Sequence, residues 1–237
     1  RGLVPEVEVG LDATAQRQQV SPWLGDLEGD GVLDLLLGIS DRVYRYQVRG
    51  GVPGDGLPLL GVGDLPRAPG PLSPAVMDCD GDGNRDLVIA DGNGRLHYLS
   101  LALAGSAQLR PLVAAGEPIV ARPPVRPCAG DWDGDGRCDL LLGDGLGHII
   151  LYRAGPQGLT AGEMLGGGET RWLPGGQVAR EVAPWITDWD GDGDADLLVG
   201  CRGGFVSLLE RTGPAQMVVA GLLQQQFAPV DAGRCAV

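Results

Sequence analysis

The sequence predicts an all-β protein in which one small antiparallel sheet recurs along the chain, and three observations support this prediction. Glycine and proline are frequent, with 41 and 18 copies in 237 residues, as expected for short strands joined by tight turns. Hydrophobic residues make up 43% of the chain, which is too many for a disordered protein. An acidic nonapeptide of the pattern DxDGDGxxD, or a close variant, occurs four times.

The nonapeptides begin at Asp26, Asp78, Asp131 and Asp188, at intervals of 52, 53 and 57 residues. A fixed period of about fifty residues without helical periodicity is typical of a propeller or a related solenoid, in which each unit is one small sheet. We therefore predict a β-propeller of four-stranded antiparallel blades within a single domain, residues 1–237. The four clear repeats cover about residues 21–72, 73–125, 126–182 and 183–225.

Each repeat has the same order of strand signals. A proline stands four residues before the first aspartate, where a strand can begin without needing its N–H. The predicted second strands include residues 35–37, 87–89, 140–142 and 197–199, the third strands include 43–46 and 149–152, and segments 58–63 and 109–115 supply fourth strands. Antiparallel alternation then places the acidic loops on one face, and the second-to-third hairpins and inter-blade connections on the opposite face.

The number of blades depends on the two ends of the chain. Another loop at the same spacing would fall at residues 240–245, beyond Val237. Residues 1–20 and 226–237 are therefore predicted to form a partial blade. Two alternatives remain, a small closed ring or an excerpt of a seven-bladed propeller, and the absence of a methionine before Arg1 fits a processed chain or an excerpt.

The acidic loops predict calcium sites, because Ca²⁺ takes six to eight oxygen ligands and alternate carboxylates of a tightly curled loop can converge on one point. Loop positions 1, 3, 5 and 9 are acidic, and position 7 is expected to offer its backbone carbonyl. The predicted side-chain ligands are Asp26, Glu28, Asp30 and Asp34; Asp78, Asp80, Asp82 and Asp86; Asp131, Asp133, Asp135 and Asp139; Asp188, Asp190, Asp192 and Asp196. The predicted position-7 ligands are Val32, Asn84, Arg137 and Asp194, and we expect about four Ca²⁺ ions, one for each loop.

Glycine at positions 4 and 6 of every loop suits the sharp folding between ligands, and Gly31, Gly83, Gly136 and Gly193 are expected to have unusual φ. Position 12 is aliphatic in every loop, which excludes an EF-hand. Sixteen of the 31 acidic residues occupy positions 1, 3, 5 and 9, so the net charge of −13 reflects metal sites. Metal binding is expected to be coupled to folding or rigidity, because the bare carboxylates would repel one another.

Composition excludes several classes of function. All 18 basic residues are arginine, so Schiff-base lysines and the P-loop lysine are absent. Nucleic-acid binding is not expected, since no basic patch with interleaved aromatics occurs. The sequence shows no signal peptide and no apolar run long enough to cross a bilayer. Five cysteines lack CxxC spacing, and two alternative disulfides are considered, Cys201 with Cys235 or Cys128 with Cys138.

Tryptophans divide into a repeated set and a single exception. Four stand in repeated columns and are predicted to pack within or between blades: Trp23, Trp185, Trp132 and Trp189. For Trp132 and Trp189, stacking on a sugar is the alternative interpretation. Trp172 lies in the longest connector, beside Arg171, on the face predicted to lie opposite the acidic loops. Arg171 and Trp172 are therefore the candidate ligand-binding residues, and packing beneath the connector is the competing interpretation for the tryptophan.

The acidic loops that run into DLLLG or DLLVG resemble FG-GAP/VCBS repeats, the calcium-binding blades of integrin α-subunit propellers and of many secreted bacterial proteins. The resemblance covers about residues 20–212. It implies a propeller fold, calcium at the carboxylates named above and an extracellular, cell-surface or periplasmic location. The family's Phe-Gly and Gly-Ala-Pro signatures are not intact, being replaced by segments such as SPWLGD and LLGISD.

The leading functional hypothesis is a secreted or surface calcium-binding propeller that acts as a non-catalytic recognition or adhesion module. Calcium would be structural, and a glycan or protein ligand would bind on the face opposite the loops. One alternative is an accessory or catalytic domain of a polysaccharide-degrading enzyme, which could use Asp91 and Asp144. Another is a scaffold subunit of an envelope complex.

Overall fold

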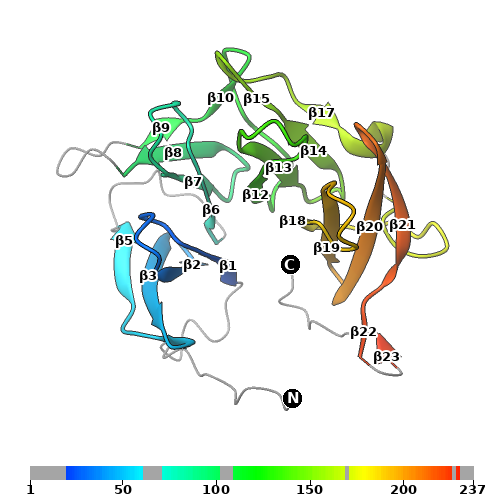
Figure 1. Ribbon diagram of the computed structural model, residues 1–237, viewed down its shortest axis with the longest axis horizontal. Coiled ribbons are helices and arrows are strands. Elements are labelled where there is room, and N and C mark those ends of the chain that lie inside the picture. The colour runs from blue at the N-terminus through cyan, green and yellow to red at the C-terminus, as the bar shows by residue number, and fades with distance from the viewer. Residues whose placement is uncertain (1–19, 61–70, 102–108, 169–170, 226–227, 230–237) are drawn as a thin grey trace.

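A computed structural model of the protein describes residues 20–60, 71–101, 109–168, 171–225 and 228–229. Its sheets form an open arc, in which the first strand of each main sheet lies toward the centre (Figure 1). The all-β prediction is confirmed, and the sheets that the structure describes do not close into a ring. The predicted partial blade at 1–20 and 226–237 falls almost entirely outside the described residues. Within the described ranges, no helix is long and apolar enough to cross a membrane.

Four antiparallel sheets correspond to the four predicted blades. Blade 1 contains β1 (Val20–Gly25), β2 (Leu33–Ile39), β3 (Arg42–Arg49) and β5 (Leu57–Leu60), with β4 (Val52–Pro53) also paired to β3. Blade 2 contains β6 (Ser73–Met77), β7 (Asp86–Ala90), β8 (Leu96–Ser100) and β9 (Arg110–Pro111). Blade 3 contains β12 (Arg126–Gly130), β13 (Asp139–Gly143), β14 (Ile149–Tyr152) and β17 (Glu163–Met164). Blade 4 contains β18 (Ala183–Thr187), β19 (Asp196–Cys201), β20 (Phe205–Gly213) and β21 (Gln216–Leu222).

Smaller elements lie outside these four sheets, and one of them falls within the segment 109–115, for which a fourth strand was predicted. Strands β10 (Val113–Ala114) and β11 (Glu117–Pro118) join β15 (Ala154–Gly155) and β16 (Gly158–Leu159) in a separate sheet. The parallel pairing of Ala114 with Leu159 links the connection that leaves blade 2 to the segment between the third and fourth strands of blade 3. The remaining elements are the 3-10 helix η2 (Leu165–Gly168) and the hairpin β22 (Gln224–Gln225) and β23 (Ala228–Pro229).

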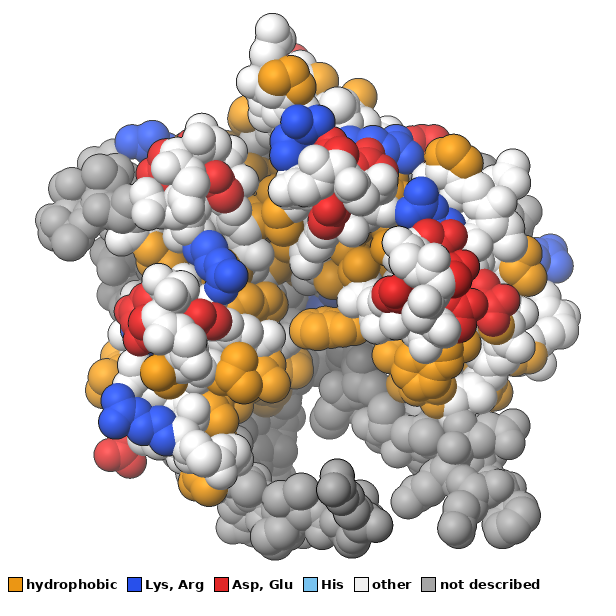
Figure 2. Space-filling view, in the orientation of Figure 1, with side chains coloured by type: hydrophobic (Ala, Val, Ile, Leu, Met, Phe, Trp, Pro, Cys, Tyr) orange, Lys and Arg blue, Asp and Glu red, His pale blue; other side chains and the backbone are white. Residues whose placement is uncertain are grey.

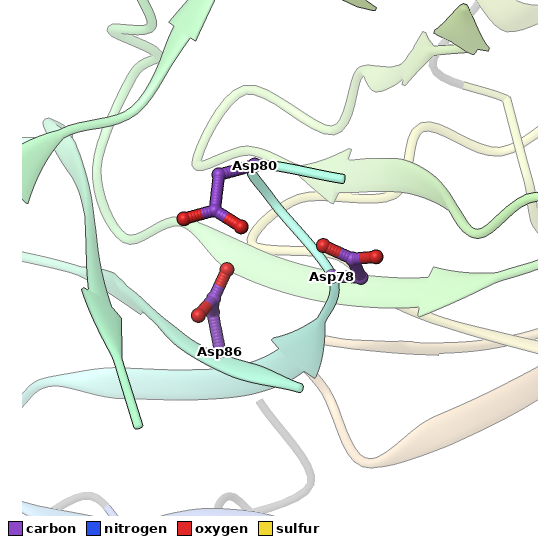
Figure 3. Close-up of side chains that lie close together, drawn as sticks. All are labelled: Asp78, Asp80 and Asp86. Carbon is purple, nitrogen blue, oxygen red and sulfur yellow. The ribbon is translucent and has the colours of Figure 1, made fainter. Parts of the chain in front are cut away.

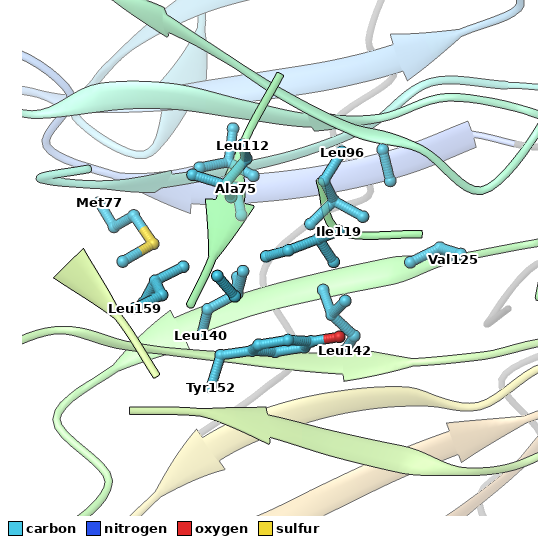
Figure 4. Packing of buried hydrophobic residues seen from close by; sticks show 13 residues of the cluster. Ala75, Met77, Leu96, Leu112, Ile119, Val125, Leu140, Leu142, Tyr152 and Leu159 are labelled. Atoms are coloured by element: carbon cyan, nitrogen blue, oxygen red, sulfur yellow. The ribbon is translucent and has the colours of Figure 1, made fainter. Parts of the chain in front are cut away.

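The hydrophobic core lies between neighbouring blades. Strand β13 shows the principle, because Leu140 and Leu142 belong to the cluster shared with blade 2 (Figure 4). Leu141, on the same strand, belongs to the cluster shared with blade 4. All three leucines are completely buried, so this strand is apolar on both faces. Burial of each such side chain contributes about 1.5–3 kcal/mol, which makes inter-blade packing the main stabilising term.

On one face, backbone hydrogen bonds join the second-to-third hairpin of a blade to the blade that follows it. The Ser40 carbonyl accepts the Leu72 N–H at 2.9 Å, and the Asp144 carbonyl accepts the Val182 N–H at 3.3 Å. These contacts join a second-to-third hairpin to the connection that enters the following blade, as the antiparallel order predicted. Close approach requires glycine beside them, since a Cβ at Gly143 would lie 2.1 Å from the Val182 carbonyl oxygen.

Two predictions about tryptophan burial were wrong. Trp185 is 48% exposed and Trp189 is 50% exposed, whereas Trp132 is buried as predicted. Trp132 packs in the cluster between blades 3 and 4, but blade 4 has no following blade among the described residues. The repeated columns therefore predicted burial correctly only where a neighbouring sheet covers the side chain.

The predicted cysteine pairings are not formed where they can be assessed. Cys128 and Cys138 are free thiols, and they pack against different inter-blade clusters, so the pairing of these two residues was wrong. Burial raises the pKa of the Cys128 thiol to about 11, which keeps it protonated and unreactive at neutral pH. Cys201 is also a free thiol, and its proposed partner Cys235 lies outside the described residues.

Substituting Gly143→Ala tests the hairpin contact. The new methyl group would meet the Val182 carbonyl oxygen at 2.1 Å and the Pro184 Cδ at 2.6 Å, so we expect a loss of about 1–3 kcal/mol in the free energy of unfolding. The matched control is Gly221→Ala, because a Cβ there meets nothing within 4 Å. Urea denaturation measures both, and equal stabilities for the two variants would contradict the assigned contact.

Candidate metal centres

Each acidic loop curls around its own first aspartate. In the second loop, the Asp78 carboxylate accepts the N–H of Gly81 at 2.7 Å and the N–H of Gly83 at 2.9 Å. The first aspartates of the other three loops accept the same two glycine N–H groups. The glycines at positions 4 and 6 have φ between 75° and 92°, which confirms the unusual φ predicted at position 6.

The last aspartate of each loop is a buried hydrogen-bond acceptor for the backbone at the start of that loop. Asp34, Asp86, Asp139 and Asp196 are almost completely buried, and each accepts the backbone N–H of the position-2 residue of its own loop. In blade 3 the same carboxylate also accepts the Ala154 N–H at 2.7 Å, just beyond the third strand. The position-9 aspartate thus joins the start of the loop to the sheet.

Three loops bring three carboxylates together. The groups consist of positions 1, 3 and 9, and one ligand atom from each residue lies within 4.8 Å of the others: Asp78, Asp80 and Asp86; Asp131, Asp133 and Asp139; Asp188, Asp190 and Asp196. In the second loop, the Asp80 and Asp86 carboxylates point toward each other with Asp78 beside them (Figure 3). Acidic side chains gather on the face of the molecule seen in Figure 2, over the ends of the blades.

The second loop passes a direct test of fit to a cation. The Oδ1 atom of Asp86 is buried and accepts no hydrogen bond. Burial raises the pKa of the Asp86 carboxyl and outweighs the lowering effects of the Cys79 N–H and the Ser100 side chain. A buried carboxylate oxygen without a partner is costly, and a hard divalent cation with oxygen ligands would satisfy it.

The predicted ligands at positions 5 and 7 stand apart from these groups. Asp82, Asp135 and Asp192 each accept the N–H of the position-7 residue of the same loop, at 2.7, 2.8 and 2.9 Å. Those position-7 residues are Asn84, Arg137 and Asp194, and Arg137 also forms an ion pair with Asp135. The use of positions 5 and 7 as ligands stays a prediction.

The first loop differs from the other three. Its residues Asp26, Glu28 and Asp34 do not form a group of close carboxylates of the kind found elsewhere among the described residues. Arg45 lies between the last two of them, donating to Glu28 at 2.6 and 2.7 Å and to Asp34 at 2.8 Å. Asp30 instead accepts the Val32 N–H at 2.8 Å, as the position-5 residues of the other loops do at position 7.

The predicted ligand-binding pair does not form a surface site. Trp172 is 3% exposed, donates its indole N–H to the Gly147 carbonyl at 2.7 Å and packs in the cluster between blades 3 and 4. The proposal that Trp172 contacts a ligand was therefore wrong, because its ring faces are covered by the core. Arg171 is exposed and contacts the Gly176 carbonyl at 3.5 Å.

The hairpin face carries features that sequence reasoning missed. A cavity of about 280 Å³ is lined by Asp91, Glu181 and several prolines, where the connections enter β6, β12 and β18. Asp91 accepts the N–H groups of Asn93 and Arg95 within its own turn and contacts His97 Nε2 at 3.2 Å. Asp144 makes the same kinds of contact, with two backbone N–H groups and a histidine of its own turn. Both candidate catalytic acids therefore stabilise the hairpins to which they belong.

Comparison with known proteins defines the class. Residues 78–142 match the FG-GAP-like repeat, a segment that runs from the start of the second loop to β13. No curated protein matches the chain. The chain therefore carries an FG-GAP-like repeat within an all-β, propeller-like fold.

Among solved structures, an Agrocybe aegerita lectin that recognises non-reducing terminal N-acetylglucosamine is similar in fold, with a TM-score of 0.50 at 18% identity. The alignment covers 93% of this chain and 56% of the lectin chain, so the protein spans little more than half the lectin's length. A Photorhabdus luminescens Tc holotoxin pore has a TM-score of 0.42 at 22% identity, over 92% of this chain and 10% of that chain. BBS1N in complex with ARL6DN has a TM-score of 0.43 at 14% identity, over 88% and 59%.

Substituting Asp139→Ala tests the structural role of position 9. The change removes a charged acceptor from the N–H groups of Trp132 and Ala154, so we expect a loss of about 3 kcal/mol in metal-free buffer. Asp135→Ala is the control and should cost less than about 1 kcal/mol, because its ion pair with Arg137 is exposed to solvent. Urea unfolding in a chelator measures both, and similar losses would refute the distinction.

Proposed function

We propose that the protein is a secreted or cell-surface calcium-binding propeller of the FG-GAP/VCBS type that recognises a ligand without catalysis. The observation that carries the proposal is the set of three aspartate groups, one of which contains a buried oxygen with no partner. Secretion is proposed because FG-GAP/VCBS repeats resembling these loops occur in secreted and surface proteins, and extracellular Ca²⁺ modules bind in the range of about 10⁻⁴–10⁻³ M.

The aspartates at positions 1, 3 and 9 of the second, third and fourth loops would hold the ions. Bound calcium would supply positive charge and additional coordination for carboxylates that now face one another. Its role would be structural, because the position-9 carboxylates connect the loops to the inter-blade core. Burial raises the pKa of Asp139 as well as of Asp86, which is the expected state of such carboxyls before a cation binds.

Calcium should therefore stabilise the protein. Binding to the native state alone contributes about 2.7 kcal/mol for each site when free calcium is one hundred times the Kd. Differential scanning calorimetry with calcium and with a chelator measures the effect, and magnesium at the same concentration serves as the control for ionic strength. An unchanged Tm in calcium and chelator would falsify a structural role for calcium.

The ligand surface is proposed on the hairpin face, at the cavity lined by Asp91 and Glu181. Glu181 has φ of +51°, a left-handed backbone conformation that is uncommon outside glycine and is concentrated at functional positions. Its carboxylate contacts Arg202 at 2.7 Å and retains acceptor capacity for a further donor. A carboxylate beside proline rings suits a sugar, which offers hydroxyl donors and apolar C–H surfaces, and the lectin of similar fold favours a glycan over a protein ligand.

A glycan array probed with and without chelator tests this assignment. We expect binding to at least one glycan class, and Glu181→Gln should weaken it by about tenfold or more, since a hydrogen bond to a charged acceptor is lost. Glu117→Gln is the control, because Glu117 is exposed on β11, away from the cavity. The absence of binding to any glycan on the array, or equal glycan affinity of the two variants, would contradict the glycan assignment and favour a protein ligand.

A further inference from the structure

The first loop contains its own cation. Arg45 donates from Nη1 and Nη2 to the two Glu28 oxygens at 2.6 and 2.7 Å, and from Nε to Asp34 Oδ1 at 2.8 Å. One guanidinium therefore satisfies the position-3 and position-9 carboxylates together, in the fork geometry for which arginine is suited. The corresponding oxygen of the second loop, Asp86 Oδ1, is the one that has no partner.

The arginine is peculiar to blade 1. Arg45 pairs across the sheet with Leu36, which is the second residue after the loop's last aspartate. The residues at the same register in the other blades are Tyr98, Leu151 and Leu208, none of which carries a charge. Only the first loop therefore receives a cation from this position of the third strand.

A second difference in the same blade matches the first. Position 3 is glutamate in the first loop and aspartate in the other three, so Glu28 has one more methylene with which to reach the guanidinium. The side-chain hydrogen bond from Arg45 lowers the pKa of the Glu28 carboxyl and so keeps it ionised. The Arg45 side chain is 19% exposed and that of Asp34 1% exposed, which limits screening of this ion pair by solvent, whereas the Glu28 side chain is 48% exposed.

The third loop also has an arginine nearby, and the comparison shows what is missing there. Arg153 Nε lies 3.5 Å from Asp133, but the same guanidinium is held by Glu163 and by the Pro214 carbonyl. It forms no ion pair with Asp139, and the three carboxylates of that loop remain together. An arginine near the loop is thus insufficient to separate its carboxylates. The first loop differs from the third because its arginine bridges the carboxylates at positions 3 and 9.

We infer that Arg45 is a tethered cation that takes the place of calcium in the first loop, so that the protein binds three calcium ions and not four. A divalent ion at this loop would have to displace a fixed positive charge that already makes three hydrogen bonds. Blade 1 consequently keeps its loop ordered without metal, whereas blades 2, 3 and 4 depend on it. The inference rests on the proposed calcium function of the other three loops.

Native mass spectrometry of the full chain titrated with calcium tests this directly. The wild type should bind three ions, and the double substitution Glu28→Asp with Arg45→Leu, which gives blade 1 the residues of blades 3 and 4, should bind four. Arg49→Leu is the matched control on the same strand and should stay at three, because Arg49 is exposed and contacts Gln47 and not the loop. A second measurement guards against misfolding: in chelator the double variant should melt below the wild type, and excess calcium should reverse the difference.

The outcomes separate the two proposals. Four ions on the wild type, or three on a double variant that calcium restores to wild-type Tm, would overturn the role of Arg45 while leaving calcium binding intact. No calcium on either protein would overturn the calcium function itself, and with it the inference.

Discussion

Each blade depends on one buried carboxylate, the last aspartate of its acidic loop. This group is almost completely buried in all four blades, and it holds the N–H of the position-2 residue, which fixes the loop over the sheet. Burying an ionised carboxylate costs several kcal/mol unless charge and hydrogen bonds compensate it. The Oδ1 oxygen accepts from Arg45 in the first blade, has no hydrogen-bond partner in the second, and accepts the backbone N–H of Ala154 in the third and of Arg211 in the fourth. The need for a cation therefore follows from the unpartnered oxygen in the second loop, and from the three close carboxylates in the third and fourth loops.

Antiparallel strand order divides the molecule into two faces with different roles. The acidic loops join first and second strands on one face, where the carboxylates gather (Figure 2). The hairpins on the other face form hydrogen bonds with the connection that enters the next blade, and one of them, at Asp91, lines the cavity beside Glu181. Any coupling between a cation on the loop face and a ligand on the hairpin face would therefore have to pass through the first strands of the blades and the inter-blade core. This separation is why we propose a structural role for calcium and place the proposed recognition surface on the opposite face.

The repeat pattern predicted most of the fold, because loop glycines, the closing aspartate and the apolar strand recur in fixed columns. It failed where a residue's environment depends on a neighbouring sheet, as with the exposed Trp185, or on a distant connector, as with the buried Trp172. The sequence predicted the aspartates at positions 1, 3 and 9 that lie together in three loops, but not the contact of Arg45 with the first loop, since spacing along the chain carries no information about which side chain of the third strand reaches the loop. A signal did exist: Glu28 and Arg45 both depart from their columns in the same blade. The cavity at Glu181 had no such signal, because its walls come from three separate connections.

The central claim is that the grouped carboxylates make three loops dependent on calcium, whereas the Arg45 guanidinium leaves the first loop independent of it. Hydrogen–deuterium exchange of the wild-type protein with and without calcium tests it at the level of single loops. The account predicts slower exchange on calcium addition in peptides that span residues 78–86, 131–139 and 188–196, with no change in residues 26–34. Unchanged exchange in those three loops, or protection confined to the first, would contradict it.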